Sequence, residues 1–128
     1  MAAATVLLID SDADSIAIYS MILQHHGFAV IHAHDPETGL RVALETRPDL
    51  VVSELFLPAV RGLSLFNRLR ADQRVAETPV IVLDSILSTD SEFTEALGSL
   101  NRLKKPCEPS RLLLEVQRLL ARPVTLAQ

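Results

Sequence analysis

The chain has 128 residues, of which 48% are hydrophobic, and its 12 basic against 16 acidic side chains give a formal net charge of −4. This length suits one compact domain, and the acidic balance excludes the basic field that nucleic-acid binding needs. No apolar run approaches the roughly 20 residues that span a bilayer, and no signal peptide is evident. We therefore expect a cytoplasmic protein that binds neither nucleic acid nor membranes. The single cysteine, Cys107, fits a reducing compartment.

Short apolar runs of strand length alternate along the chain with segments of helical spacing. The five expected strands are residues 5–10, 29–33, 50–55, 80–83 and 100–103. Expected helices lie near residues 18–22, 40–44, 63–69 and 93–97, and a fifth has an apolar stripe over residues 112–120. Asp12 or Asp14 is a candidate cap for the first helix, Gly27 for its end, and Asp35-Pro36 opens the second helix.

This alternation implies crossover connections, and hence a parallel sheet with helices on both faces. The fold class is therefore α/β, a doubly wound three-layer arrangement. We expect residues 1–122 to form this single domain and residues 123–128 to be a short C-terminal tail.

Charged residues gather where the expected strands end. In an open parallel sheet, ligands bind outside the carboxyl ends of the strands. We expect a shared rim there, formed by Asp10, Asp12, Glu54, Asp84 and Lys105.

The order of these motifs resembles the response-regulator receiver domains, a family that includes the chemotaxis regulators. The resemblance covers nearly the whole chain. It is carried by the segments at residues 6–12, 26–30, 48–54, 57–58 with Gly62, 79–83 and 104–106. It implies a flavodoxin-like fold with strand order 2-1-3-4-5, five flanking helices, and a role in two-component or phosphorelay signal transduction.

The resemblance also implies a phosphorylation site, which this chain retains only in part. In the family, an acidic pair after the first strand holds Mg²⁺, an Asp after the third accepts phosphate, a Ser or Thr follows the fourth, and a Lys follows the fifth. Asp10 matches the first acid and Lys105 the lysine. Pro106 follows Lys105 in a bond that the resemblance suggests is cis.

Four positions depart from the family pattern. Ser11 replaces the second acid, Glu54 the phosphoacceptor Asp, Asp84 the hydroxyl residue, and Arg102 the switch aromatic. Glu54 carries an extra methylene, which displaces its carboxylate on the order of an ångström, and in-line phosphoryl transfer is sensitive to such displacement.

The losses at Ser11 and Asp84 weaken the site further. Because Ser11 stands where the family has a second carboxylate, the site should bind Mg²⁺ weakly or not at all. Asp10, Asp12 and Glu54 are the remaining candidate ligands. Asp84 would repel a phosphoryl group, leaving Lys105 to neutralise Glu54 and Asp84.

We therefore expect a stand-alone pseudo-receiver without enzymatic activity or required cofactor, which acts through contacts with a histidine kinase, a regulator or another copy of itself. A homodimer through the fourth helix, fifth strand and fifth helix, about residues 89–120, is one expected arrangement. Two alternatives stay open: a working receiver that uses Mg²⁺ to accept phosphate at Glu54 or a nearby acid, and a receiver fold that binds a metal or small ligand at the rim. Glu54 could instead mimic a phosphorylated Asp.

Four histidines, at positions 25, 26, 32 and 34, also raise a metal-binding hypothesis. His32 and His34 alternate onto one face of the second expected strand. Because no third ligand stands at useful spacing, the sequence favours structural roles for all four.

Overall fold

The computed structural model describes residues 3–55, 59–84 and 101–121, with the backbone alone described for 59–63. Five strands and four helices lie within these ranges. The strands are β1 (Thr5–Ile9), β2 (Ala29–Ala33), β3 (Leu50–Glu54), β4 (Val80–Asp84) and β5 (Asn101–Lys104), and the helices are α1 (Ala13–His25), α2 (Pro36–Thr46), α3 (Ala59–Ala71) and α5 (Pro109–Leu120). The helix expected near residues 93–97 and the tail at 123–128 lie outside the described residues.

All five strands pair in parallel in one sheet, in the order β2-β1-β3-β4-β5. Each expected strand is confirmed to within two residues. Glu54 and Asp84 prove to be the last residues of β3 and β4, and β5 begins and ends one residue later than expected. The order reverses at β1, which is hydrogen-bonded to β2 on one side and β3 on the other, so this is the doubly wound topology that the alternation predicted.

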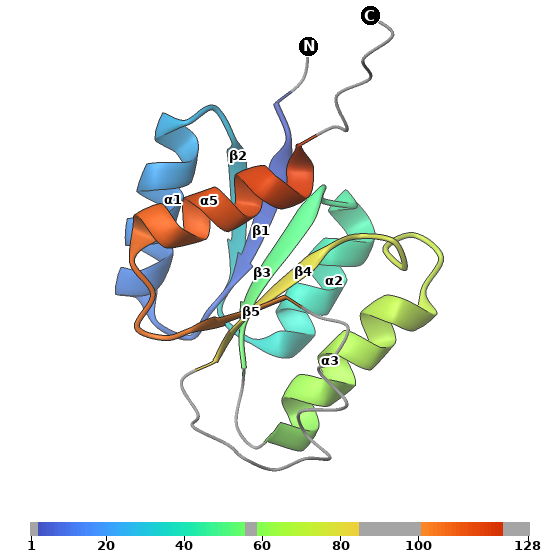
Figure 1. The fold of residues 1–128 in the computed structure, drawn as a ribbon. Helices are drawn as coiled ribbons and strands as arrows, with labels where there is room; N and C mark the ends of the chain where they lie inside the picture. The colour runs from blue at the N-terminus through green and yellow to red at the C-terminus, as the bar shows by residue number, and fades with distance from the viewer. Residues whose placement is uncertain (1–2, 56–58, 85–100, 122–128) are drawn as a thin grey trace, which may run out of the picture.

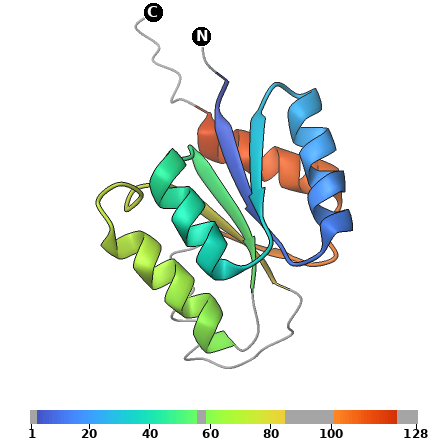
Figure 2. The same ribbon diagram turned by 180° about the vertical axis from the view of Figure 1, so that it is seen from behind.

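Helices cover both faces of the sheet. Figure 1 shows α1 and α5 in front of the strands, and Figure 2 shows α2 and α3 on the opposite face. Alternate residues of each strand point to opposite faces, so Leu7 and Ile9 enter one core while Val6 and Leu8 enter the other. The fold is therefore a three-layer sandwich with two hydrophobic cores.

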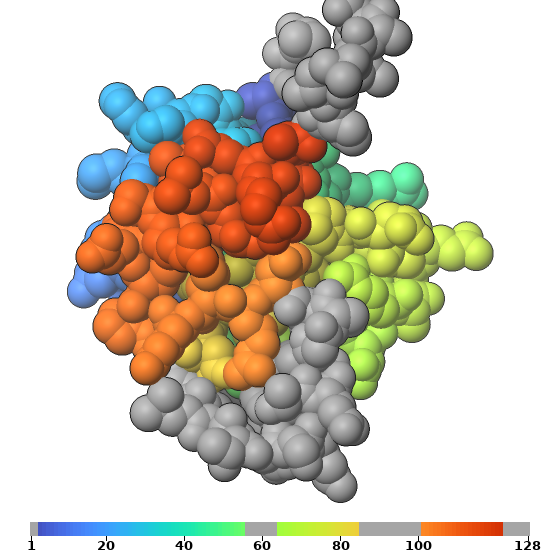
Figure 3. All heavy atoms as spheres, viewed as in Figure 1, coloured from blue at the N-terminus to red at the C-terminus, as the bar shows by residue number. Residues whose placement is uncertain are grey.

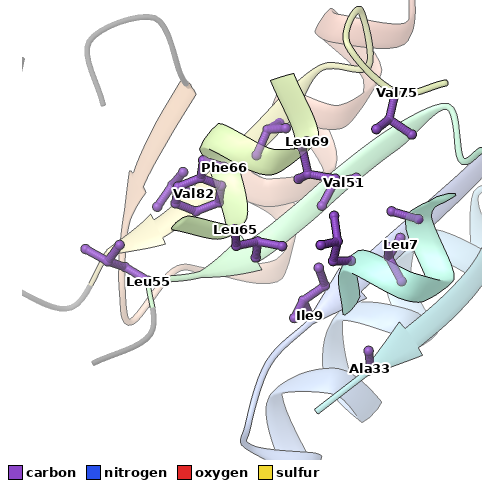
Figure 4. Close-up of a cluster of buried hydrophobic side chains, with 13 residues drawn as sticks. Leu7, Ile9, Ala33, Val51, Leu55, Leu65, Phe66, Leu69, Val75 and Val82 are labelled. Carbon is purple, nitrogen blue, oxygen red and sulfur yellow. The ribbon is translucent and has the colours of Figure 1, made fainter. Parts of the chain in front are cut away.

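Figure 4 shows part of the core under α2 and α3, where Leu65, Phe66 and Leu69 of α3 pack on Val51 and Val82. The other core receives Tyr19 and Leu23 of α1 together with three α5 residues, Leu112, Leu113 and Val116. Figure 3 shows α5 and β5, in red and orange, covering much of their face. This burial confirms the apolar stripe predicted for the last helix.

Local sequence signals set several helix ends. Asp12 caps α1 by accepting a hydrogen bond from the Asp14 backbone N–H, and Asp35 caps α2 by accepting from the Thr38 backbone N–H. Pro36 occupies the first turn of α2, where its missing N–H costs nothing. Gly27 follows α1 with φ +92°, a conformation that glycine adopts without strain.

Helix α2 lies unusually close to β1 at one position. A Cβ atom added to Gly39 would sit 2.5 Å from Ile9 Cδ1, well inside van der Waals contact. Glycine at this position therefore sets how closely α2 approaches the strand that leads to Asp10.

Within the described ranges, no helix is long and apolar enough to cross a membrane.

Candidate functional site

The carboxyl ends of four strands bring charged residues together at one edge of the sheet, which is the lower edge in Figure 1. We call Asp10, Glu54, Asp84 and Lys105 the rim. Asp10 directly follows β1, Glu54 and Asp84 end β3 and β4, and Lys105 directly follows β5. The predicted convergence of these four residues is confirmed.

Lys105 is the centre of the rim. Its Nζ lies 2.8 Å from Asp10 Oδ2 and 3.7 Å from Glu54 Oε2. Only 4% of the Asp10 side chain and 19% of the Lys105 side chain are exposed to solvent. Because both partners are largely withdrawn from water, this ion pair is shielded from the screening that weakens surface pairs.

These carboxylates also govern the charge of Lys105. Burial by itself lowers the pKa of the Lys105 ammonium, but the hydrogen bond to Asp10 and the attraction of Asp10 and Glu54 together outweigh burial. The pKa of Lys105 is therefore raised above its ordinary value, and the rim keeps this positive charge throughout the neutral range.

Asp84 is held by a residue that the sequence analysis assigned to another role. An Arg102 guanidinium nitrogen lies 2.5 Å from Asp84 Oδ2, and the two side chains are 31% and 5% exposed. We expected Lys105 to neutralise Asp84, whereas the ion pair seen in the structure is with Arg102. The Lys105 backbone N–H does donate to the Asp84 carbonyl, at 2.9 Å.

The register of β4 and β5 explains this pairing. Asp84 lies opposite Lys104, and Arg102 precedes Lys104 by two positions, so Arg102 and Lys104 share a face of β5. A guanidinium on a long stem can reach along that face to the end of β4, where it forms a charge-assisted hydrogen bond. Arg102 at the family's switch position is thus part of an ion pair.

Glu54 is held from two sides. Its Oε1 accepts a hydrogen bond of 2.5 Å from the backbone N–H of Ser11, and its Oε2 faces Lys105. The Ser11 side chain takes no part in this bond. The sequence analysis singled out Ser11 because it replaces an acidic residue of the family. Nothing in the sequence indicated that the Ser11 backbone N–H would bind the Glu54 carboxylate.

Asp12 belongs to the start of α1 rather than to the rim. Its Oδ1 accepts from the Asp14 backbone N–H, and its Oδ2 accepts from the Ser15 hydroxyl, both at 3.0 Å. The Asp12 backbone N–H in turn donates to Asp10 Oδ1 at 2.8 Å. Asp12 thus organises the loop after β1 and uses its own carboxylate as a helix cap.

This donor set fits Mg²⁺ poorly. Mg²⁺ takes one or two carboxylates and several waters in tight octahedral geometry. Here Asp10 accepts from Lys105 and from a backbone N–H, and Glu54 accepts from Ser11. Across the described part of the chain, no group of three or more His, Cys, Asp or Glu side chains is arranged to hold a metal ion.

The turn after β5 connects the rim to α1. The Lys105-Pro106 peptide bond is cis, as the resemblance suggested. The Tyr19 hydroxyl of α1 donates to the carbonyl of Cys107 at 3.0 Å. Burial raises the pKa of Tyr19, so the phenol stays protonated and available as the donor at neutral pH. The sequence contained no signal for this contact, because the partners are 88 residues apart.

Comparison with known proteins gives one family. The response regulator receiver domain model matches residues 6–117. The chain is 34% identical over 124 residues to the DNA-binding dual master transcriptional regulator RpaA of Synechocystis sp., covering 91% of this chain and 49% of that protein. It is 25% identical over 119 residues to Protein PilH of Pseudomonas aeruginosa, covering 92% of this chain and 98% of that protein.

The chain spans about half the length of RpaA and of several other relatives. Among solved structures, the chemotaxis protein CheY4 of Vibrio cholerae superposes with a TM-score of 0.81 at 29% identity, covering 93% of this chain and 100% of that chain. A response regulator protein from Burkholderia multivorans superposes with a TM-score of 0.76 at 31% identity, covering 96% and 98%. With sequence and backbone both in agreement over nine-tenths of its length, the chain belongs to the response regulator receiver domains of two-component signalling.

Proposed function

We propose that this receiver domain works without phosphorylation, as a pseudo-receiver that signals through protein contacts. The observation that carries the proposal is the fixation of Glu54, the residue at the acceptor position, by the Ser11 backbone N–H at 2.5 Å and by Lys105 at 3.7 Å. An acceptor carboxylate must present a free oxygen lone pair in line with the incoming phosphorus. The two contacts take one acceptor site on each oxygen of Glu54 and hold the carboxylate in one orientation, which we propose is not the in-line one.

The charges around the acceptor position support the same proposal. The rim and Arg102 together hold three carboxylates against two cations. A phosphoryl group would add up to about two negative charges, and two unit charges about 4 Å apart interact by roughly 4 kcal/mol at an effective dielectric near 20. Arg102 offsets part of the Asp84 charge, but Asp84 still stands at the position from which a hydroxyl would donate to the phosphoryl group.

The proposal assigns Lys105 and Arg102 a static role. Both cations already have carboxylate partners, so the charges of the rim are largely compensated within the domain without an added phosphate or Mg²⁺. We propose that these ion pairs fix the domain in one conformation and that no catalytic step takes place at the rim. Such a module requires no cofactor and acts in the cytoplasm.

Protein partners follow from the family and from the charge of the chain. A net charge of −4 disfavours direct contact with nucleic acid, so we propose a histidine kinase, a regulator or a second copy as the partner. Of the expected homodimer surface, β5 and α5 are described, and the fourth helix lies outside the described residues. Leu114 of α5 is 59% exposed, and we propose it as an apolar contact for the partner.

The test is phosphorylation by acetyl phosphate with Mg²⁺, followed by intact mass. We expect the wild-type chain to gain no phosphate. A triple variant, Ser11→Asp with Glu54→Asp and Asp84→Thr, restores the three family residues and is expected to gain one. The matched control is the single variant Glu54→Asp, which separates the length of the acceptor from the charges around it.

Phosphate on the wild-type chain would refute the proposal and support a working receiver, and peptide mapping would then locate the acceptor. Tight Mg²⁺ binding by the wild-type rim in calorimetry would instead support the metal-binding alternative. If neither the wild-type chain nor the triple variant gains phosphate, the residues at the three substituted positions are not what prevents phosphorylation. That outcome also counts against the proposal.

A further inference from the structure

Strand β2 and the residue after it carry two histidines, His32 and His34, at an outer edge of the sheet. β2 is the outermost strand, paired to β1 alone (Figure 2). Val30 of β2 packs on the core beneath α1 and α5, whereas Ile31 packs on the opposite core. By the two-residue period of a strand, His32 lies on the face that includes Val30. His34 follows one residue beyond the strand, and both histidines are exposed.

The two imidazole rings are spaced for chelation. Their centroids lie 5.5 Å apart with an interplanar angle of 66°. An imidazole nitrogen binds Zn²⁺ at about 2.0–2.1 Å, which places each ring centroid ~3.2 Å from the ion, so two rings at a tetrahedral angle have centroids ~5.2 Å apart. The observed separation exceeds this by a few tenths of an ångström, within reach of small side-chain rotations.

Neither ring has a competing partner in the part of the chain that the structure describes. Each ring lies against the other ring, and no hydrogen bond to either imidazole is present there. The neighbouring carboxylate of Asp35 accepts from the backbone N–H and the hydroxyl of Thr38, both at 2.8 Å. The described residues therefore offer two nitrogen donors at this place and no third ligand.

We propose that His32 and His34 together chelate one late transition-metal ion, Zn²⁺, Ni²⁺ or Cu²⁺, with water in the remaining positions. Imidazole nitrogen suits these ions, whereas Mg²⁺ prefers oxygen. The ion would join the end of β2 to the turn that enters α2. This inference does not depend on whether the rim accepts phosphate.

A second histidine pair provides an internal control. His25 and His26 lie at the end of α1 with ring centroids 5.2 Å apart. Neighbouring residues on a helix point about 100° apart, and His26 Nδ1 already donates to the Ile22 carbonyl at 3.0 Å. This pair has a similar spacing but lacks a common face, so it should bind the same ions more weakly.

The test is calorimetric titration of the full chain with Zn²⁺, with Mg²⁺ as the comparison ion, alongside thermal unfolding. An ion that binds the folded chain raises its melting temperature by mass action. We expect one Zn²⁺ per chain and a rise in melting temperature for the wild type and for His25→Ala/His26→Ala. His32→Ala and His34→Ala should each lose about tenfold or more in affinity, and the double variant should show no rise.

An observation on the unaltered chain complements the variants. Addition of Zn²⁺ should shift the ring resonances of His32 and His34 in the NMR spectrum and leave those of His25 and His26 in place. The proposal is wrong if the wild type binds no Zn²⁺, if binding survives in His32→Ala/His34→Ala, or if the resonances that shift belong to the other pair.

Discussion

Arg102 and Asp84 join the ends of two neighbouring strands through a 2.5 Å ion pair in which the carboxylate is 95% withdrawn from solvent and the guanidinium about two-thirds withdrawn. Removing one partner from such a pair leaves the other charge poorly solvated. We expect Arg102→Ala and Asp84→Ala to be coupled by about 1–2 kcal/mol in a double-mutant cycle. Urea unfolding of the wild type, both single variants and the double variant measures this coupling.

Arg111→Ala is the matched control, since Arg111 is exposed on α5, and exposed substitutions change stability by less than ~0.5 kcal/mol. Additive effects of Arg102→Ala and Asp84→Ala would contradict the importance of the pair.

The described part of the fold could be predicted because its signals are local. Buried parallel strands appear as continuous apolar runs. Asp35-Pro36 indicates the start of a helix and Gly27 the end of one, because few other residues favour the backbone conformations needed there. The convergence of Asp10 and Lys105 then follows from topology alone.

The pairings within the rim could not be predicted, because they depend on side-chain reach. Arg102 contacts Asp84 only because the β4–β5 register places it two residues before the strand end. The bond from Ser11 to Glu54 uses a backbone N–H that every residue except proline possesses, so no residue type could have indicated it.

Lys105 should make the chain sensitive to alkali. Because its folded-state pKa is raised by Asp10 and Glu54, its contribution is fully present below the unfolded pKa near ~10.4 and is lost as the pH rises through the folded value. We expect the free energy of unfolding to fall above about pH 10, and Lys105→Met to reduce that fall. Urea unfolding between pH 7 and 11 measures it.

Tyr19 requires a background control, because burial raises the pKa of this phenol too, and its stabilising effect is lost over the same alkaline range. The comparison is therefore Tyr19→Phe against Tyr19→Phe/Lys105→Met. Identical pH profiles for these two variants would show that Lys105 does not contribute.

Alanine at position 39 should be tolerated only if the Ile9 side chain moves or is made smaller. The added methyl would lie 2.5 Å from Ile9 Cδ1, and overpacking of this kind costs about 1–3 kcal/mol. Ile9→Val removes that methyl group, so the double variant Ile9→Val/Gly39→Ala should be more stable than the sum of the single effects predicts. Chemical denaturation of the three variants measures the difference.

Gly27→Ala is the comparison. Gly27 has φ +92°, and no atom lies within 4 Å of the methyl group that the substitution would add. This substitution should cost about 1–2 kcal/mol through backbone strain and gain nothing from Ile9→Val. Equal rescue of both glycine variants would show that the effect is not steric.

Asp35 should stabilise α2 through its cap. The Thr38 backbone N–H and then its hydroxyl hold the pKa of Asp35 below its usual value, so the stabilising effect is present above the unfolded pKa near ~3.9 and is lost as the pH falls through the folded value. Asp35→Ala should cost about 1 kcal/mol at pH 7, whereas Asp35→Asn, which keeps an accepting oxygen, should cost little. Unfolding of the three proteins at pH 7 and pH 3 measures this, and an Asn variant as weak as the Ala variant would exclude the cap.

The hydrogen bond from Tyr19 to the Cys107 carbonyl gives the molecule a mechanical property. It fastens the middle of α1 to the turn that follows Lys105, and α1 and α5 already pack in the same core. A partner that binds either helix therefore contacts an element that is joined to the turn after Lys105, the residue whose ammonium group lies in the rim. The phenol of Tyr19 thus links the α1 flank of this receiver directly to the turn beside its charged edge, in addition to the packing of the shared core.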